Sequence, residues 1–599
     1  MMSFPRLSTP SRVRLFLVAG LGLLLAACAH RPVQEQAKPV AEAVVEQSDG
    51  DQAESKAVAA PTVAPKPELP NQELTEAVLY EYLLAEIAGQ RGSIGLAAQA
   101  YADLAKRTRD PRIAKRATEV ALYARMPSAA IDAARIWYET EPSSTQALQT
   151  LTSLLINTKR HDEALPYLQK LFAADGSNAG DGFMQLSRLL ANNQDKALTL
   201  KLVQQLAQPY PQLAQAHFAL AQAANAAEQG ELALAEVRTA ARLKPDWELP
   251  PLFEAQLLQR ESNALALKRL AAFLERYPKS REVRMSYARI LVADGKYTEA
   301  RAEFQTLSKD FPDNVDVVFA VGVLSLQLQD YALAEANFKR LLALPYRDKN
   351  TVRLYLGQIA EEQKNYPEAL RWYDEVAGGE QYLKAQIRHA LVLSKQGKLD
   401  AARAYLRQID VDSEQARVQL LLTEAQLLRD ANQPREAFEL IGNALQNTPD
   451  QPELLYDYAM LAEKLGRMDL LETNLKKLIS LQPDHAHAYN ALGYSLADRN
   501  LRLPEAQGLI EKALQLAPDD PFIIDSMGWV MYRMGKNSQA LEYLRKAYAA
   551  RPDPEIAAHL GEVLWVAGEP REAEKIWLDA SKKTPGNDAL ISTIKRFKH

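Results

Sequence analysis

Apolar and small residues recur at helical spacing along most of the chain, and residues 521–552 show the pattern most clearly. They fall at i, i+3, i+4 and i+7 in the first half and at i, i+4 and i+7 in the second: Ile524, Met527, Gly528, Met531, Ala540, Leu544 and Ala547. This spacing predicts two amphipathic helices, because a helix brings such positions onto one face. Gly535 marks the turn between the two helices, and Pro552 ends the second.

This helix pair repeats with a period of 33 to 36 residues. A small or apolar residue in the second helix marks the register: Ala97, Ala130, Ala164, Ala197, Ala233, Ala266, Ala300, Ala334, Ala369, Ala402, Ala437, Leu471, Ala506, Ala540 and Ala573. Twelve residues beyond most of them stands a proline: Pro142, Pro209, Pro245, Pro278, Pro312, Pro449, Pro483, Pro518, Pro552 and Pro585. Alanine is common in this chain, so chance inflates the copies near Ala97, Ala164 and Ala197. We therefore expect about 11–15 repeats.

Three consecutive copies match the tetratricopeptide pattern, in which small residues stand at positions 8 and 20 and proline at position 32. The matching residues are Gly493, Ala506 and Pro518, then Gly528, Ala540 and Pro552, then Gly561, Ala573 and Pro585. The resemblance implies an all-α solenoid, a right-handed superhelix of antiparallel helix pairs, which we place at residues 71–586. Residues 587–599 are predicted to form a C-terminal capping helix, and residues 176–182 a loop that is either a lengthened turn or a seam between two half-spirals.

The N-terminus has the layout of a signal peptide over residues 1–27, with arginines ahead of a short apolar run. Leu25-Ala26-Ala27-Cys28 resembles the bacterial lipobox, which implies cleavage before Cys28 and lipidation of that cysteine, with palmitate among the acyl groups. Ala29 in place of aspartate implies sorting to the outer membrane, facing the periplasm. The alternative is an ordinary secretory signal with a chance cysteine. Residues 28–70 are rich in proline and alanine and are predicted to be a disordered tether.

Composition and motifs exclude several classes of function. The formal net charge is -5, and no basic stripe of the kind that nucleic acids require interrupts the sequence. We find no catalytic motif and no metal-ligand spacing, and His485 with His487 is the only close histidine pair. The sequence therefore predicts a non-enzymatic protein without catalytic residues, metal, cofactor or small-molecule substrate, which binds other proteins.

The resemblance also indicates where partners would bind, because in this family positions 2, 5, 9, 12 and 13 of the first helix line a concave groove. In the C-terminal repeats such positions hold aromatic and polar residues: Tyr456, Asn490, Tyr494, Asp525, Trp529, Tyr532, Arg533, Glu562 and Trp565. Aromatic side chains are enriched among binding hot spots. The alternative is that several of them pack against adjacent repeats. Gly528→Leu is expected to lower the melting temperature and impair binding, whereas Trp529→Ala should weaken ligand binding with less effect on melting.

The stretches 525–530 and 557–565, together with the lipobox and the repeats, resemble a group of pseudomonad outer-membrane lipoproteins. The resemblance implies an adaptor that binds a periplasmic carboxyl-terminal processing protease and its substrates, the peptidoglycan hydrolases, and promotes their degradation. Two alternatives remain open. One is a scaffold for outer-membrane protein assembly or polysaccharide export, and the other is a cell-wall enzyme.

Overall fold

The computed structural model describes residues 73–174, 179–190 and 195–597, and these residues form helices without any strand. The helices from α2 to α31 follow one another as antiparallel pairs, except that α8 and α9 pack mainly against α10, and α32 follows the last pair. The predicted all-α array of helix pairs is therefore confirmed. The signal peptide, Cys28 and the tether lie outside the described residues. No described helix combines the length and apolarity needed to cross a bilayer.

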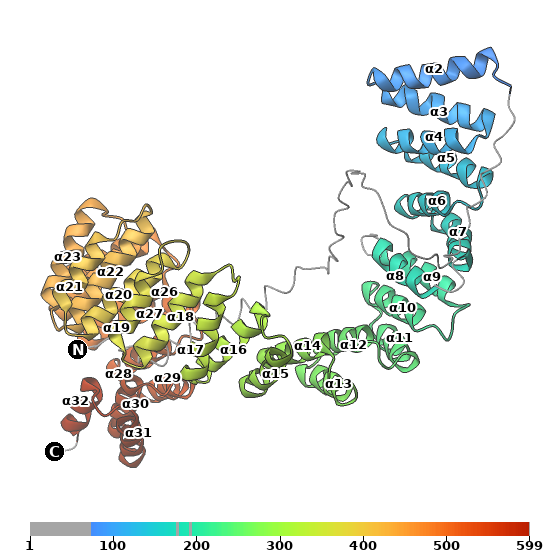
Figure 1. Cartoon of the computed structure of the whole chain (residues 1–599). Coiled ribbons are helices and arrows are strands. Elements are labelled where there is room, and N and C mark those ends of the chain that lie inside the picture. Colours follow the sequence, from blue (N-terminus) through green and yellow to red (C-terminus); the bar gives the residue numbers. More distant parts are fainter. Residues whose placement is uncertain (1–72, 175–178, 191–194, 598–599) are drawn as a thin grey trace, which may run out of the picture. The chain divides into compact units, whose positions relative to one another are not determined.

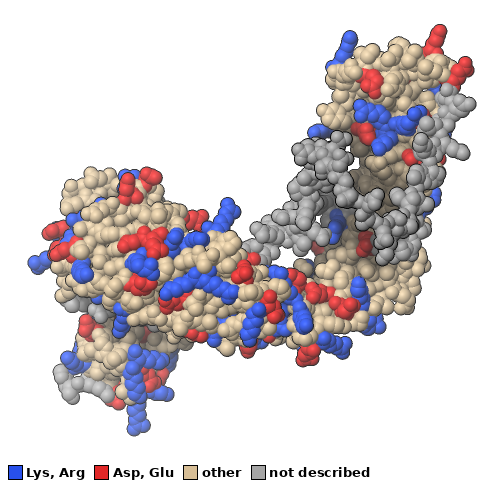
Figure 2. Space-filling view, in the orientation of Figure 1, with Lys and Arg blue, Asp and Glu red and all other residues tan. Residues whose placement is uncertain are grey.

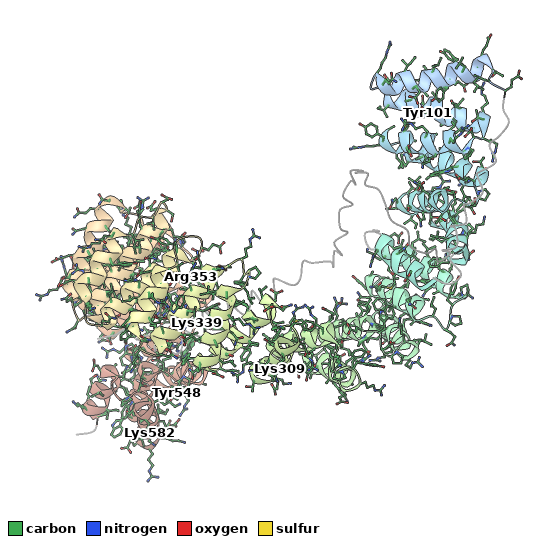
Figure 3. The ribbon with its side chains drawn as sticks, in the orientation of Figure 1. Tyr101, Lys309, Lys339, Arg353, Tyr548 and Lys582 are labelled. Carbon is green, nitrogen blue, oxygen red and sulfur yellow. The ribbon has the colours of Figure 1, made fainter. Side chains whose placement is uncertain are left out.

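The chain divides into two compact units, and the first ends at Phe311. Its helices stack in chain order (Figure 1) and are α2 (Glu76–Gln90), α3 (Ile94–Thr108), α4 (Pro111–Tyr123), α5 (Pro127–Thr140), α6 (Thr145–Asn157), α7 (His161–Ala174), α8 (Ala179–Leu190), α9 (Lys196–Ala207), α10 (Ala214–Ala226), α11 (Gly230–Leu243), α12 (Leu249–Gln259), α13 (Asn263–Arg276), α14 (Arg281–Ala293) and α15 (Tyr297–Asp310). The first pair is joined by a side-chain hydrogen bond from the Tyr101 hydroxyl, labelled in Figure 3, to the Glu86 carboxylate.

The second unit begins at Pro312. Its helices are α16 (Val315–Gln327), α17 (Tyr331–Ala343), α18 (Lys349–Glu362), α19 (Tyr366–Asp374), α20 (Tyr382–Lys395), α21 (Leu399–Gln408), α22 (Glu414–Asp430), α23 (Pro434–Asn447), α24 (Pro452–Lys464), α25 (Met468–Leu481), α26 (Ala486–Asp498), α27 (Leu503–Leu516), α28 (Pro521–Arg533), α29 (Asn537–Ala550), α30 (Pro554–Val566), α31 (Pro570–Lys583) and α32 (Asp588–Phe597). The last helix packs mainly against α30.

Local signals fix where the helices of each pair begin and end, and α28 illustrates them. The Asp520 side chain accepts hydrogen bonds from the backbone N–H groups of Phe522 and Ile523, which caps the first turn. Pro521 occupies the first turn, where a missing N–H costs nothing. After the helix, Gly535 adopts a φ of +78°, which lets the chain reverse into α29.

The register residues of the second helices are almost all completely buried. Fourteen of the fifteen predicted ones have no exposed surface: Ala97, Ala130, Ala164, Ala233, Ala266, Ala300, Ala334, Ala369, Ala402, Ala437, Leu471, Ala506, Ala540 and Ala573. The prediction at Ala197 is wrong, because Ala197 is not part of the buried core. In α9 the fourth helical residue is Thr199, which is 4% exposed and takes the place that alanine has elsewhere.

Glycine is required where a first helix crosses close to its partner. A Cβ atom at Gly528 would stand 2.6 Å from Leu544 Cγ, and one at Gly561 would stand 2.0 Å from Trp577 Nε1. Trp577 is only 2% exposed, so its ring has little room to move. Gly508, by contrast, lies in α27 with nothing within 4 Å of a Cβ.

Gly561→Ala is therefore expected to lower the free energy of unfolding by about 1–3 kcal/mol, because the added methyl overpacks the crossing. Gly508→Ala is the matched control, and it should raise stability by about 0.5–1 kcal/mol through the better helix propensity of alanine. Chemical denaturation of the two variants measures both effects. Equal stability of the two variants would contradict the close crossing of α30 and α31.

The predicted loop at residues 176–182 is wrong over its second half, because α8 already begins at Ala179. Gly182 in this stretch packs against α7. A Cβ atom at Gly182 would stand 2.7 Å from the Phe172 ring, so the absence of a side chain lets the ring lie against the helix.

Candidate functional site

The predicted groove residues lie on α24, α26, α28 and α30, which are the first helices of four consecutive pairs. They do not form an open stripe. Tyr494, Asp525, Trp529 and Glu562 are buried, with 7%, 3%, 4% and 4% of their surface exposed. The other five are partly buried: Tyr456, Asn490, Tyr532, Arg533 and Trp565. The first helices α26, α28 and α30 contact one another directly, and these side chains fill the seams between repeats.

His559 of α30 is the centre of the buried group. Its Nδ1 lies 2.8 Å from Asp525 Oδ2 of α28, and its Nε2 lies 3.3 Å from the Tyr494 hydroxyl of α26. The Trp529 ring stacks on the imidazole, with ring centroids 4.2 Å apart and planes 25° apart. We call these four residues, Tyr494, Asp525, Trp529 and His559, the His559 cluster. It joins three consecutive repeats through side chains.

Two opposing effects set the pKa of His559. Burial alone would lower the pKa, but the charge of Asp525 and its hydrogen bond to the ring raise the pKa above its usual value. The Asp525–His559 contact is accordingly an ion pair when the ring is protonated. Four buried polar atoms around the cluster have no hydrogen-bond partner among the described residues: Asn490 Oδ1, Asp525 Oδ1, Trp529 Nε1 and Arg533 Nε.

Glu562 forms a second contact point beside the cluster. Its carboxylate accepts a hydrogen bond from the Tyr532 hydroxyl at 3.3 Å and pairs with Arg596 of α32. Burial raises the pKa of Glu562, and the charges of Arg596 and His559 oppose that rise. Through this pair, α32 is tied to the first helices as well as packed on them.

Two predicted residues lie apart from the His559 cluster. Tyr456 stacks on His485 with ring centroids 5.6 Å apart, and Trp565 stacks on Trp577 with centroids 5.8 Å apart. The sequence pattern missed His559 because it stands at position 6 of its repeat, which the groove positions leave out. The signal that could have found it is its spacing of 34 residues from Asp525, one repeat plus one position.

A second buried acid occupies the seam between α18 and α20. The carboxylate of Glu361, 4% exposed, accepts hydrogen bonds from Lys395 Nζ at 2.7 Å and from the Tyr373 hydroxyl at 2.8 Å. Arg388 approaches the same carboxylate within 3.2 Å. Burial tends to raise the pKa of Glu361, but the two cations outweigh burial and lower it.

Glu361→Gln is expected to lower the free energy of unfolding by about 1.5–3 kcal/mol at neutral pH, because hydrogen bonds to a charged group are lost. The stability that ionised Glu361 contributes is present above the usual glutamate pKa of about 4.3 and is lost as pH falls through the lowered pKa. The difference between wild type and variant should therefore shrink below about pH 4.3. Urea denaturation at several pH values measures it, and a difference that does not change with pH would contradict the ion pairs.

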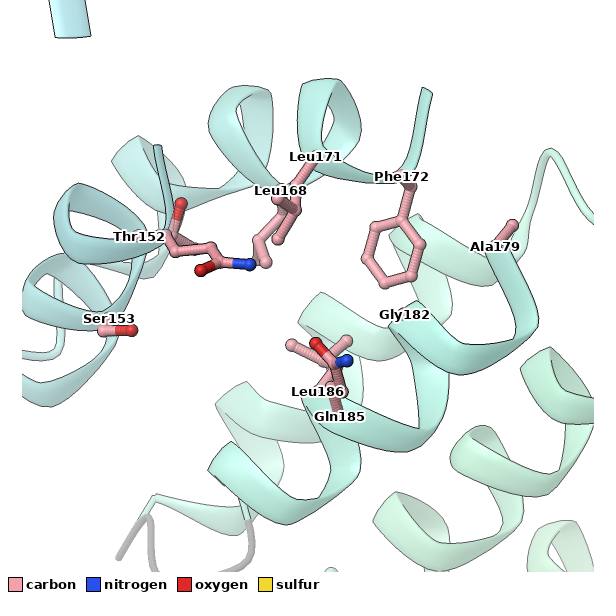
Figure 4. Close-up of a pocket in the computed structure, with 10 residues that line it drawn as sticks. Thr152, Ser153, Leu168, Leu171, Phe172, Ala179, Gly182, Gln185 and Leu186 are labelled. Carbon is pink, nitrogen blue, oxygen red and sulfur yellow. The ribbon is translucent and has the colours of Figure 1, made fainter. Parts of the chain in front are cut away.

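A pocket of about 240 Å³ with apolar and neutral polar lining lies between α6, α7 and α8 (Figure 4). It is lined by Gln149, Thr152, Ser153, Leu168, Leu171, Phe172, Ala179, Gly182, Gln185 and Leu186. The Phe172 ring stands at one side of this space (Figure 4), over Gly182. The lining carries no ionised group, so the pocket offers shape and a few hydrogen bonds only.

Charge on the surface is mixed. Lys and Arg side chains alternate with Asp and Glu over the face shown in Figure 2. Within the part of the chain that the structure describes, no three metal-ligating side chains come together.

Comparisons with known proteins give the family. The tetratricopeptide-repeat family model matches residues 256–315, 288–351, 319–382, 422–470 and 527–588. The TPR repeat-containing protein PA4667 of Pseudomonas aeruginosa is 37% identical over 528 residues, which are 87% of this chain and 88% of that protein. Cellulose synthase operon protein C of Pseudomonas fluorescens is 26% identical over 46% of this chain and 26% of its own length.

Solved structures of repeat proteins are also similar. A thermophilic TPR protein of Thermus thermophilus, TTC0263, is 25% identical with a TM-score of 0.28, over 30% of this chain and 97% of that one. The Cut9–Hcn1 complex matches over 88% of this chain and 97% of that one, at 12% identity and a TM-score of 0.31. On the family model and on a relative that is 37% identical over most of both sequences, the chain belongs to the tetratricopeptide-repeat family.

Proposed function

We propose that the chain is a non-catalytic lipoprotein adaptor of the outer membrane. It holds a periplasmic carboxyl-terminal processing protease together with peptidoglycan hydrolases and promotes their degradation. Tetratricopeptide proteins bind other proteins, and an array of this length offers room for more than one partner. The observation that carries the proposal is the joint presence of the lipobox-like Leu25-Ala26-Ala27-Cys28 and this long array in one chain.

Reconstitution tests the adaptor role. Protein lacking residues 1–28 is mixed with the purified protease and one hydrolase, and cleavage is followed with time. We expect faster cleavage than with protease alone. The control is a second protease substrate that is not a wall enzyme, whose cleavage should not change. Unchanged hydrolase cleavage would overturn the adaptor role.

Cys28→Ser tests the anchor independently of the partners. Two or more acyl chains hold a protein stably on a bilayer, whereas a chain without them has no such attachment. We therefore expect the wild type in the outer-membrane fraction and the variant in the periplasmic fraction. Mass spectrometry of the N-terminal peptide should find acyl groups on Cys28 of the wild type. If the two proteins were found in the same fraction, the proposal that lipidated Cys28 anchors the protein would be contradicted.

A second candidate is a scaffold for polysaccharide export, and similarity to cellulose synthase operon protein C favours it. Under that role the chain would contact a synthase or an outer-membrane barrel instead of a protease. Crosslinking in the native envelope followed by mass spectrometry separates the two roles. Crosslinks to a synthase without crosslinks to a protease would support this candidate.

A further inference from the structure

Four arginines surround a pocket of about 420 Å³ on the second helices of two consecutive pairs. Arg238 and Arg242 come from α11, and Arg269 and Arg276 come from α13. Glu254 of α12 lies between them. We call these five residues the arginine pocket. Its four arginines lie on the second helices α11 and α13, whereas the groove residues predicted from sequence lie on first helices.

Glu254 already uses both of its carboxylate oxygens. Arg238 Nε donates to Oε1 at 2.8 Å, and Arg269 Nε donates to Oε2. The Glu254 side chain is 5% exposed, so these two arginines stabilise a buried charge. The contact from Arg238 crosses the seam between two repeats, because α11 belongs to the preceding pair, whereas Arg269 of α13 belongs to the same pair as Glu254.

Arg242 and Arg276 do not pair with Glu254. Arg242 donates to Thr239 of its own helix at 2.9 Å. Arg276 has neither a hydrogen bond nor an ion pair with any described residue, and both side chains are exposed. Glu254 is the only acid that the structure pairs with these arginines within residues 73–174, 179–190 and 195–311. Four positive charges against one negative charge leave a surplus of three in a chain whose net charge is -5.

A related seam elsewhere in the fold shows that this surplus is not needed to bury the acid. Residues 424–428 repeat the sequence Glu-Ala-Gln-Leu-Leu of residues 254–258. Glu424, whose side chain is 4% exposed, is held by Arg403 and Arg407, and Arg403 also pairs with Glu436. Two arginines there face two acids. Two cations thus suffice to stabilise a buried glutamate, so Arg242 and Arg276 are not needed to stabilise Glu254.

From this surplus we infer that the arginine pocket is a docking site for an acidic segment of a partner protein. The guanidinium fork matches a carboxylate in two parallel hydrogen bonds, and Arg238 and Arg269 are already held in place by Glu254. Along α13, Arg269 and Arg276 are separated by a rise of about 10 Å, and α11 adds a second row. Several carboxylates spaced along a peptide can engage both rows together, whereas one phosphate ion reaches only part of them. The inference does not depend on which partner the adaptor proposal names.

The test uses the full chain and a fluorescein-labelled peptide of ten glutamates as the probe. Arg242→Glu combined with Arg276→Glu removes the surplus and leaves both partners of Glu254 intact. The matched control is Arg435→Glu combined with Arg571→Glu, two exposed arginines on α23 and α31 with the same change in net charge. Circular dichroism melting checks that all three proteins are folded.

We expect fluorescence anisotropy to show binding by wild type and control, and at least about a tenfold weaker affinity for the pocket variant. Binding should weaken as salt is raised from low to physiological ionic strength. Three outcomes would overturn the inference: no binding by wild type, an equal loss in variant and control, or full displacement of the peptide by inorganic phosphate at the peptide's own concentration. The last outcome would indicate a small-anion site. If the pocket variant has a lower melting temperature than the control, the single variant Arg276→Gln takes its place. This variant must then also bind the peptide more weakly than wild type and control do.

Discussion

Trp529→Ala is expected to lower the free energy of unfolding of the C-terminal repeats by about 3–5 kcal/mol. Trp529 is 4% exposed, and its ring stacks on His559. The centroids of the Trp529 and Tyr532 rings are 5.3 Å apart. Truncation of Trp529 therefore leaves a cavity in a seam between repeats. The expectation from sequence, a binding defect with less effect on melting than Gly528→Leu has, required an open groove and is replaced by this one. Chemical denaturation measures the loss.

Hydrogen exchange should place the loss of stability in α26, α28 and α30, because each repeat contacts mainly its neighbours. Leu578→Ala on α31 is the control, since Leu578 is 56% exposed and such a change costs at most about 0.5 kcal/mol. If Trp529→Ala were no more destabilising than this control, the indole ring would not be buried against its neighbours.

His559→Leu is expected to cost a similar amount, about 3–5 kcal/mol, because it leaves the carboxylate of Asp525 buried without its cation. Asp525 is 3% exposed, so water cannot replace the lost partner fully. The double variant Asp525→Leu with His559→Leu should recover most of the loss, since replacing both partners removes the buried charge. A double variant as unstable as the single one would show that packing of the imidazole, and not the charge, carries the effect.

The same pair makes stability depend on pH. The pKa of His559 is raised in the folded chain. Burial opposes the rise, but the charge of Asp525, its hydrogen bond to the ring and the charges of Glu562 and Glu555 together outweigh burial. Stability from protonated His559 is therefore fully present below the unfolded pKa of about 6.5 and is lost as pH rises through the folded pKa. The advantage of wild type over the double variant should shrink above about pH 6.5. The same denaturation series, repeated across this range, measures the change.

The repeat register could be predicted from sequence because the register residues occupy tightly packed sites at the helix crossings. Ala540 and Ala573 are completely buried where two helices cross, and only a small side chain fits there. Ala197 failed because α9 begins later relative to its alanine, which places Thr199 at the crossing. The repeat spacing alone cannot decide between Ala197 and Thr199 as the register residue of α9, because both side chains are small.

The exposure of the groove residues could not be predicted, because it depends on how close successive first helices approach. Trp529 stands at a groove position by repeat numbering, yet His559 of the next repeat covers its ring. Sequence numbering describes one repeat at a time, whereas this contact is made between two. Cys28 and the partner proteins remain predictions.

The buried acids at the seams also restrict how the array can evolve. Glu254 and Glu424 each depend on arginines that belong partly or wholly to the preceding helix pair. Deleting or exchanging a single pair would bring a different second helix against the glutamate and leave its charge without the matching cation. Each of these carboxylates is therefore stabilised only when the correct repeat precedes it. Charge pairing between adjacent repeats, as well as shape, thus specifies the order of the repeats.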